Sequence, residues 1–207
     1  REQGIAVEGN HPANFILMTL VAMEDEGLVV LPTHRIVQGL EDFSAEQILE
    51  SCRGYFQVSP LSGGLLEIQA SLEKEYTNCK KAFVLYEKQG AYLLSLKDTD
   101  CLEDLFPGKS AVYRQLDVSI LHTLVLEKLL HIDRENLANQ KNLVYTRSME
   151  EAMEAVDRGQ ANCAFLINPT RVEEIAQVAA NGEKMPQKST YFYPKLITGL
   201  VMNLLEG

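Results

Sequence analysis

The chain has 207 residues, of which 46% are hydrophobic and 23% charged, a balance typical of a soluble globular protein. This composition excludes a disordered, collagen-like or fibrous chain. With 19 basic and 29 acidic residues the formal net charge is −10, which argues against a surface that attracts nucleic acid or anionic lipid as a whole. A local basic pocket stays compatible with this charge.

Apolar stretches and cysteines limit the location and the chemistry of the protein. The longest apolar runs, 15–23 and 28–31, are far shorter than the roughly 20 residues that a membrane-spanning helix needs. The first residues lead into no signal-peptide pattern, so we expect a cytoplasmic protein. The four cysteines include no Cys-x-x-Cys pair, so we expect reduced, mostly buried thiols. His122 and His131 lie nine residues apart, which does not suit a metal pair on one helical face, so we expect no metal site.

Apolar and β-branched segments predict strands throughout the chain. The expected strands are 14–24, 28–31, 55–58, 81–87, 91–97, 142–146, 163–167 and 189–193. An acidic turn that ends at Gly27 joins the first two in a predicted hairpin. Lys88-Gln89-Gly90 joins the fourth and fifth in a second hairpin, with Gly90 at a position that favours a positive φ. A loop is expected at 59–64.

Capping signals and helical periods predict the helices, at 44–51, 65–76, 117–130, 148–158, 170–180 and 196–205. Ser44 and Gln47 form a capping-box pattern, while Asp117 and Thr170 are the expected caps of their helices. The helix at 117–130 is apolar over most of its circumference, which predicts packing on both sides.

The order of these elements indicates a mixed α/β (α+β) fold. We expect a mixed sheet with hairpins early and a βαβ-like series late, with helices packed on it. The 207 residues suit a single domain; a division near residue 110 into two lobes, 14–110 and 111–207, is the alternative.

Three polar segments next to predicted elements are candidates for a site. The first, Pro32-Thr33-His34-Arg35, follows a strand directly. Arg35 offers a planar fork for carboxylate or phosphate, and His34 is the residue of the expected site suited to act as a catalytic acid or base. The alternative is a surface turn in which Arg35 pairs with an acid.

The second segment, Asn168-Pro169-Thr170, joins an apolar strand to a helix. The free N–H groups at the start of that helix would suit an anion, with Asn168 and Thr170 beside it. Glu173 and Glu174 in the first turn would repel a phosphate, and most helix caps bind no ligand.

The third segment, 182–190, partly matches the phosphate-loop pattern through Gly182, Lys188 and Ser189. Gln187 replaces the second glycine, and the segment follows a helix rather than a strand, so we reject a nucleotide P-loop. The polar run Lys188-Ser189-Thr190-Tyr191 still suits the binding of an anion. A solvated edge strand is the alternative.

These segments also carry a resemblance to a known family. Four strings resemble the bacterial and archaeal family called domain of unknown function 1015; they lie at 31–35, 115–122, 164–170 and 185–195. In that family an Asp-Gly-His-His-Arg-type motif precedes this region and is similar to that of the ParB and sulfiredoxin superfamily, which includes a free-serine kinase. The motif is absent here. The resemblance therefore implies a carboxy-terminal portion, and it assigns phosphotransfer to the parent protein. The proton-transfer histidine of the missing motif cannot be assigned to His11 or His34 of this chain.

The expected function is the ligand-binding portion of a cytoplasmic enzyme that acts on a small anionic or phosphorylated metabolite. Arg35 and Lys188 would clamp the anion, and hydrogen bonds would come from a polar set comprising Thr33, Asn168, Thr170, Ser189, Thr190 and Tyr191. The alternative is a non-catalytic module for metabolite sensing or assembly, with a homodimer formed through the apolar helices at 118–130 and 196–205. Neither nucleic acid nor a membrane is expected as a partner, and no cofactor is indicated.

Overall fold

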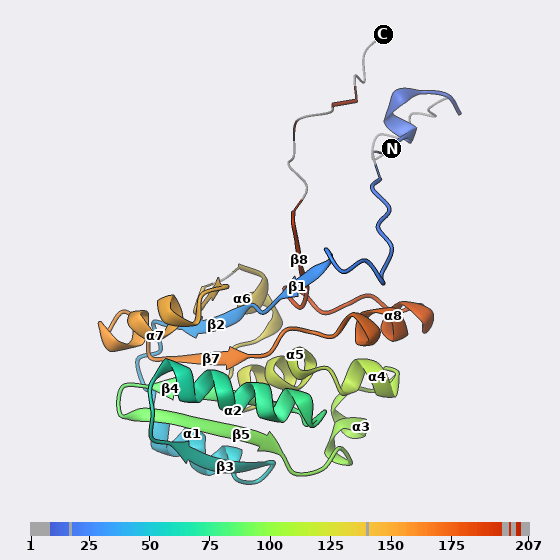
Figure 1. The fold of residues 1–207 in the computed structure, drawn as a ribbon. Coiled ribbons are helices and arrows are strands. Elements are labelled where there is room, and N and C mark those ends of the chain that lie inside the picture. The colour runs from blue at the N-terminus through green and yellow to red at the C-terminus, as the bar shows by residue number, and fades with distance from the viewer. Residues whose placement is uncertain (1–8, 17, 140, 196–198, 200–201, 204–207) are drawn as a thin grey trace. The chain divides into compact units, whose positions relative to one another are not determined.

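The computed structural model describes residues 9–16, 18–139, 141–195, 199 and 202–203 (Figure 1). The chain divides into two compact units, one made of Arg1–Val29 with Phe192–Gly207 and the other of Val30–Tyr191. The two lobes expected on either side of residue 110 stay a prediction. No helix among the described residues has the length and apolar character needed to cross a bilayer.

A six-stranded sheet organises the larger unit, in the order β3-β5-β4-β7-β2-β6, with every neighbouring pair antiparallel. Its strands are β2 (His34–Val37), β3 (Phe56–Leu61), β4 (Ala82–Glu87), β5 (Gly90–Leu96), β6 (Leu143–Thr146) and β7 (Cys163–Ile167). A separate two-stranded sheet contains β1 (Val29–Leu31) and β8 (Tyr191–Tyr193). The expected mixed α+β class is confirmed, while the larger sheet is antiparallel throughout rather than mixed.

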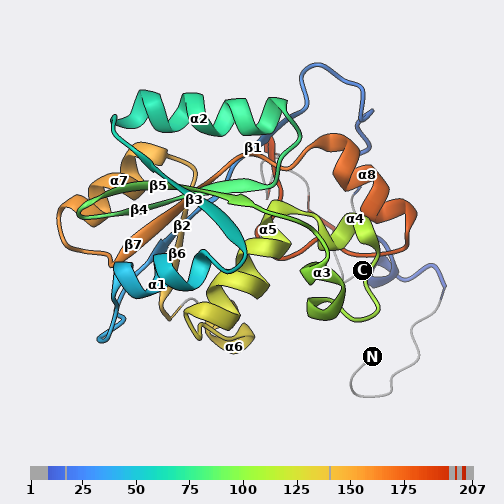
Figure 2. The same cartoon turned by 90° about the horizontal axis from the view of Figure 1, so that it is seen from below.

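Helices cover both faces of the six-stranded sheet (Figure 2). The helical segments are η1 (Pro12–Asn14), α1 (Ala45–Cys52), α2 (Leu65–Thr77), α3 (Cys101–Leu105), α4 (Ala111–Arg114), α5 (Asp117–Ile120), η2 (Leu121–Leu129), α6 (Arg134–Asn139), α7 (Met149–Asp157) and α8 (Val172–Ala180). One core lies between the sheet and α2 with α7, and the other between the sheet and α1, α3, α5 and η2.

Strand residues alternate between these two cores, as the period of two in a strand requires. Ile36, Val84 and Leu166 belong to the core under α2 and α7, while Val37 and Phe165 belong to the opposite core. The central strands are therefore buried on both faces.

Local sequence signals specify several elements correctly. The Ser44 hydroxyl caps α1 by accepting a hydrogen bond from the Gln47 N–H at 3.3 Å, and Ser148 caps α7 in the same way. The β4–β5 hairpin forms as expected, although Gly90 begins β5 without a positive φ. β6, α7 and β7 make the βαβ-like series: both strands are antiparallel to β2, which lies between them, so they are parallel to each other.

The expected hairpin of 14–24 with 28–31 is wrong. The described residues of 15–24 contain no strand and are exposed, and β1 pairs with β8 instead. An apolar run forms a strand only where neighbours satisfy its backbone groups and cover its side chains. The loop expected at 59–64 is shorter than predicted, because β3 continues to Leu61; Pro60 is tolerated there because β3 is an edge strand.

Two expected helix caps are also wrong. Asp117 is the first residue of α5 rather than its N-cap, which is Leu116, and Arg171 rather than Thr170 precedes α8. The Thr170 hydroxyl instead donates to the carbonyl of Ser189 at 2.8 Å. Most of the helix expected at 196–205 lies outside the described residues.

The apolar helix expected at 117–130 begins as α5 and continues as a nine-residue π-helix, η2. Its hydrogen bonds include one from the Leu130 N–H to the Val125 carbonyl at 2.9 Å, five residues back. Leu121, Leu124 and Leu126 are fully buried in the core that η2 shares with the sheet. This helix is therefore covered within the molecule and is not the exposed interface of the assembly alternative.

Candidate functional site

The candidate site lies where β2 begins and where β6 and β7 end. His34 at the start of β2 is opposite Thr146, the last residue of β6, and Arg35 is opposite both Tyr145 and Phe165. Because β6 and β7 run parallel, the segments that follow them begin at the same end of the sheet. His34 and Arg35 therefore belong to a central strand, not to a turn after a strand.

Arg35 is completely buried and holds the site together. Its Nη2 donates to the Lys188 carbonyl at 3.0 Å, its Nη1 to the Thr33 carbonyl, and its Nε to His122 Nε2 at 3.3 Å. The guanidinium carbon lies 5.6 Å from the centre of the Tyr145 ring. Burial lowers the pKa of Arg35 to about 10, so the group stays charged near neutral pH.

The turn 186–189 presents Lys188 in an unusual backbone conformation. Lys188 has a φ of 55°, in the left-handed region that favours glycine. The Ser189 N–H donates to the Pro186 carbonyl at 3.3 Å, and the Ser189 hydroxyl donates to the same carbonyl at 2.7 Å. Arg35 holds the Lys188 carbonyl and Thr170 holds that of Ser189. The turn is thus fixed from both sides.

A cavity of about 300 Å³ lies beside this turn, lined by a largely polar set of residues: Thr33, Tyr145, Thr146, Arg147, Glu151, Lys188, Thr190 and Tyr191. Lys188 Nζ lies 5.8 Å from the centre of the Tyr145 ring, and the Arg147 guanidinium lies 4.3 Å from that of Tyr191. Two exposed cations therefore border the cavity, each above an aromatic ring.

The structure brings the three sequence-predicted segments together, with different roles for their residues. Thr33, Lys188, Thr190 and Tyr191 line the cavity. Arg35, Thr170 and Ser189 form the hydrogen-bonded support of the 186–189 turn.

Two predicted residues lie apart from the cavity lining. The Asn168 amide donates to the Leu72 carbonyl in α2 at 2.9 Å. His34 is buried, and its Nδ1 accepts a hydrogen bond from the Ile167 N–H at 3.2 Å. Burial, with a contribution from the Arg35 charge, lowers the pKa of His34 to about 4, so its imidazole is neutral near pH 7.

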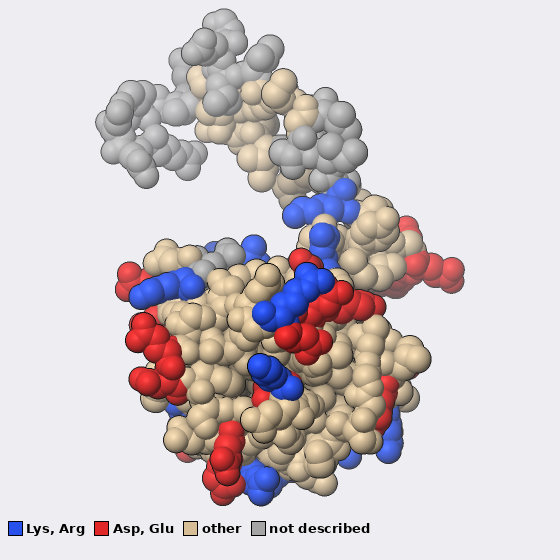
Figure 3. Space-filling model, turned by 90° about the vertical axis from the view of Figure 1, so that its left-hand side faces the viewer, with Lys and Arg blue, Asp and Glu red and all other residues tan. Residues whose placement is uncertain are grey.

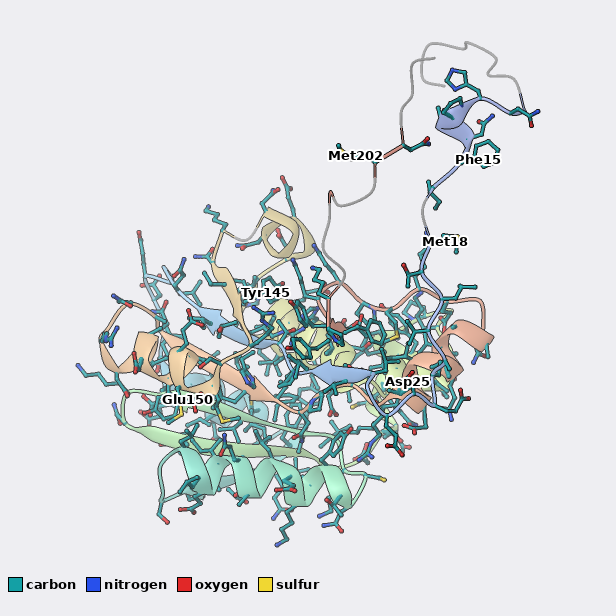
Figure 4. All side chains as sticks on the ribbon, turned by 45° about the horizontal axis from the view of Figure 1, so that its top comes forward. Phe15, Met18, Asp25, Tyr145, Glu150 and Met202 are labelled. Atoms are coloured by element: carbon teal, nitrogen blue, oxygen red, sulfur yellow. The ribbon has the colours of Figure 1, made fainter. Side chains whose placement is uncertain are left out.

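The sequence patterns missed Tyr145, Arg147 and Glu151, which belong to β6, to the residue after it and to α7. Figure 4 labels Tyr145 and, on α7, Glu150, the residue before Glu151. A signal was present, because Arg147 follows a predicted strand that runs parallel to the one before Asn168. The other lining residue, Thr146, donates its hydroxyl hydrogen bond to a Glu151 carboxylate oxygen.

Charges on the face drawn in Figure 3 are intermixed, with Lys and Arg side chains beside Asp and Glu and no extended basic surface among its described residues. The described part of the chain holds no group of three His, Cys, Asp or Glu residues placed to bind a metal ion. The four cysteines are free thiols; Cys52 and Cys163 are buried, while Cys79 is exposed. The local chemistry at the cavity is thus that of cations, hydroxyl groups and one carboxylate.

Comparisons with known proteins cover part of the chain. The family model described as "Protein of unknown function (DUF1015)" matches residues 1–119. This region holds the string at 31–35 and that at 115–122 up to Ser119; the strings at 164–170 and 185–195 lie beyond it. No functionally curated protein matches the chain.

Similar solved structures include a conserved hypothetical protein from Pyrococcus furiosus, at 16% identity and a TM-score of 0.49, covering 84% of this chain and 60% of that one. A free serine kinase in complex with AMP matches at 15% identity and a TM-score of 0.48, covering 84% of this chain and 57% of the kinase. The chain thus spans less than two thirds of the length of these structures. Likenesses this distant assign no activity to it.

Proposed function

Because the chain belongs to the DUF1015 family, whose description names no activity, we propose a function from its own cavity: it binds a small phosphorylated metabolite between Lys188 and Arg147. The observation that carries this proposal is the backbone of Lys188. A non-glycine residue with positive φ is strained, and such strain persists at functional sites where the surrounding structure enforces it. Here Arg35 and Thr170 enforce it, and the result is an ammonium group at the edge of the cavity.

The lining of the cavity suits a phosphate better than a neutral ligand. Lys188 and Arg147 supply positive charge, and the hydroxyl groups of Thr33 and Thr190 can donate hydrogen bonds to phosphate oxygens. The Glu151 carboxylate adds one negative charge to the same lining. In a ligand that carries an ammonium group beside its phosphate, the phosphate would pair with the two cations and the ammonium group with the carboxylate. Phosphoserine is therefore a better probe than inorganic phosphate alone.

Arg35 acts in this proposal as a positioning residue. Its guanidinium is buried and does not line the cavity, but it fixes the carbonyl of Lys188. His34 does not line the cavity either, and its Nδ1 is engaged by Ile167. The proposal for this chain is therefore binding, as the ligand-binding portion of an enzyme; phosphotransfer by a longer protein is a further step that these residues do not carry.

Isothermal titration with inorganic phosphate and with phosphoserine tests the proposal. We expect phosphoserine to bind more tightly than phosphate, and Lys188→Met and Arg147→Met each to weaken both about tenfold or more, because each removes a charge-assisted hydrogen bond. Phosphoserine at about 100 times its Kd should stabilise the fold by about 2.7 kcal/mol. Lys184→Met is the matched control, since Lys184 is exposed and lines neither this cavity nor its turn. Equal affinity in all four proteins would refute the site.

A second candidate function, assembly, is favoured by a different part of the chain. The segment 15–23 exposes several large apolar side chains, among them Ile16, Met18 and Leu20 at 80%, 68% and 88%. Figure 4 shows Phe15 and Met18 on this extended segment. Scattered exposed apolar residues are ordinary, but several of them within one short segment mark an interaction surface. Light scattering of the wild type and of Ile16→Ser/Leu20→Ser would show whether self-association depends on it.

A further inference from the structure

A second cavity, of about 480 Å³, lies against the π-helix η2. Its polar lining includes Ser119, His122, Thr123 and Glu127, and its apolar lining includes Phe106 and Tyr113. It shares no lining residue with the cavity beside Lys188. The proposed phosphate site therefore has none of these groups in its lining.

The π-helical geometry of η2 is what builds one wall of this cavity. In an α-helix, residues five apart such as His122 and Glu127 point about 140° away from each other. In a π-helix the hydrogen bonds run between residues five apart, so these two positions lie on adjacent turns of one face. Both line the cavity. Long π-helices are rare, and π-helical turns are frequent at functional sites.

Ser119 supplies an unsatisfied hydrogen-bonding group. The residue is 3% exposed, and its hydroxyl has no hydrogen-bond partner among the described residues. Burying such a hydroxyl without a partner is unfavourable, and native proteins do so rarely. Because Ser119 lines the cavity, a bound molecule could supply the missing partner.

His122 supplies a donor next to it. Arg35 Nε–H donates to His122 Nε2 at 3.3 Å, so Nε2 is the acceptor and the proton of the neutral imidazole is on Nδ1. Because His122 lines the cavity, its Nδ1–H is a donor for a molecule bound there. Burial and the Arg35 charge lower the pKa of His122 to about 3, which keeps the ring neutral at physiological pH.

The remaining lining decides the kind of ligand. Phe106 and Tyr113 pack edge to face, with ring centres 6.2 Å apart, and offer an aromatic surface. Lys109 pairs with Glu183 at 3.6 Å and lies over the Tyr113 ring, so its charge is already compensated. With Glu127 also in the lining, the cavity has no excess positive charge to attract an anion.

We propose that this cavity binds an uncharged aromatic carbonyl compound, such as an aromatic amide, with its ring against Phe106 and Tyr113 and its carbonyl oxygen accepting from Ser119 and His122. The apolar ring packs on the aromatic surface. The carbonyl oxygen accepts from the Ser119 hydroxyl, which has no partner among the described residues, and from the His122 Nδ1–H. This inference does not depend on the phosphate site.

The test uses benzamide as the probe, with toluene and benzoate as matched molecules, and follows the backbone amides of 117–123 and the ring nitrogens of His122 by NMR titration of the full chain. A fragment of this size that fits its site binds with a Kd of roughly 10 mM or below. We expect benzamide to shift these signals saturably and the nitrogen signal of His122 Nδ1 to report the new hydrogen bond. Toluene, which lacks the carbonyl, and benzoate, which is charged, should bind at least about fivefold more weakly.

Ser119→Ala separates ligand binding from a structural role. Without ligand, the variant should melt at the same temperature as the wild type or higher, because it removes an unsatisfied buried hydroxyl. Its affinity for benzamide should fall about fivefold to tenfold. Ser51→Ala, in an exposed helical position, should change neither the affinity nor the His122 signal. A lower melting temperature of Ser119→Ala, unchanged benzamide affinity in that variant, equal binding of toluene, or no saturable shift would each overturn the proposal.

Discussion

Arg35 Nη2 donates a hydrogen bond to the backbone carbonyl of Lys188 over 3.0 Å, between residues 153 positions apart in the chain. The same guanidinium also holds the Thr33 carbonyl and His122. One buried side chain therefore connects the start of β2, the turn at 186–189 and the π-helix. Both proposed ligand cavities are built around the partners of this residue, since Thr33 and Lys188 line one and His122 lines the other.

Replacing Arg35 tests how far the fold depends on it. Arg35→Met leaves two carbonyls and His122 Nε2 without their donor, so we expect the free energy of unfolding to fall by about 2–4 kcal/mol. Arg35→Lys keeps the charge but cannot reproduce the planar fork, and it should recover less than half of that loss. Urea denaturation of the three proteins measures the effect. A loss below about 0.5 kcal/mol in Arg35→Met would show that these bonds do not hold the turn.

Lys188→Gly should have opposite effects on stability and on binding. Glycine adopts a positive φ without strain, so we expect the free energy of unfolding to rise by about 0.5–1 kcal/mol relative to the wild type. The same change removes the ammonium group, so phosphoserine affinity should fall about tenfold or more. Thermal melting and titration calorimetry give the two values. Lys184→Gly, where φ is not positive, is the control and should not become more stable. If it were stabilised as well, the gain in Lys188→Gly could not be attributed to relief of a positive φ.

Asp117 predicts an unusual dependence of stability on pH. Its Oδ1 is buried without a hydrogen-bond partner among the described residues, and burial, opposed in part by the Lys81 charge, raises its pKa from 3.8 to about 7. Glu174 further raises this pKa and Arg171 lowers it. Since the folded state binds this proton more tightly than the unfolded state, the contribution of Asp117 is complete below about pH 4 and is lost as the pH rises to about 7.

The Asp117→Asn variant isolates that contribution. Its stability relative to the wild type should increase by about 4 kcal/mol between pH 4 and pH 8, because the amide has no proton to lose. Urea denaturation of both proteins across this range measures the difference. A constant difference over the range would mean that Asp117 titrates normally in the folded protein.

The two cavities should influence each other through the turn that separates them. Pro186 and Gln187 line the benzamide cavity, and Lys188 lines the phosphate cavity. A ligand that contacts the first two residues would restrict the turn and favour the conformation that holds Lys188 in place. We expect saturating benzamide to tighten phosphoserine binding about twofold to fivefold, with the reciprocal effect on benzamide. Calorimetric titrations in both orders measure the coupling. Equal affinities with and without the other ligand would show that the turn does not couple the two cavities.

Elements with a local cause could be predicted from the sequence. The Ser44 cap of α1, the β4–β5 hairpin and the β6-α7-β7 series depend on residues close together in the chain. The position of β2 could not be predicted, because it begins with two polar residues that a central strand rarely contains. His34 and Arg35 are tolerated there only because Ile167, Lys188 and His122 supply their partners from distant segments.

The π-helix and the strained lysine were also beyond sequence reasoning. The apolar pattern of 117–130 predicts burial but does not separate an α-helix from a π-helix, since nearly every side of this segment is apolar. The segments of the phosphate cavity could be chosen from their chemistry, yet the support of Lys188 by Arg35 became visible only in three dimensions. The expectation that Arg35 itself clamps an anion is replaced, in our proposal, by Arg147.

The insertion of β2 between β6 and β7 has a consequence for how the protein is made. β2 precedes both of its neighbours in the sheet by about 110–130 residues. On a ribosome, this strand would leave the exit tunnel with both of its edges open, and more than about 100 further residues would be added before either partner arrived. Such high contact order predicts slow closure of the sheet, during which chaperones that shield open strand edges would have their longest access to the nascent chain.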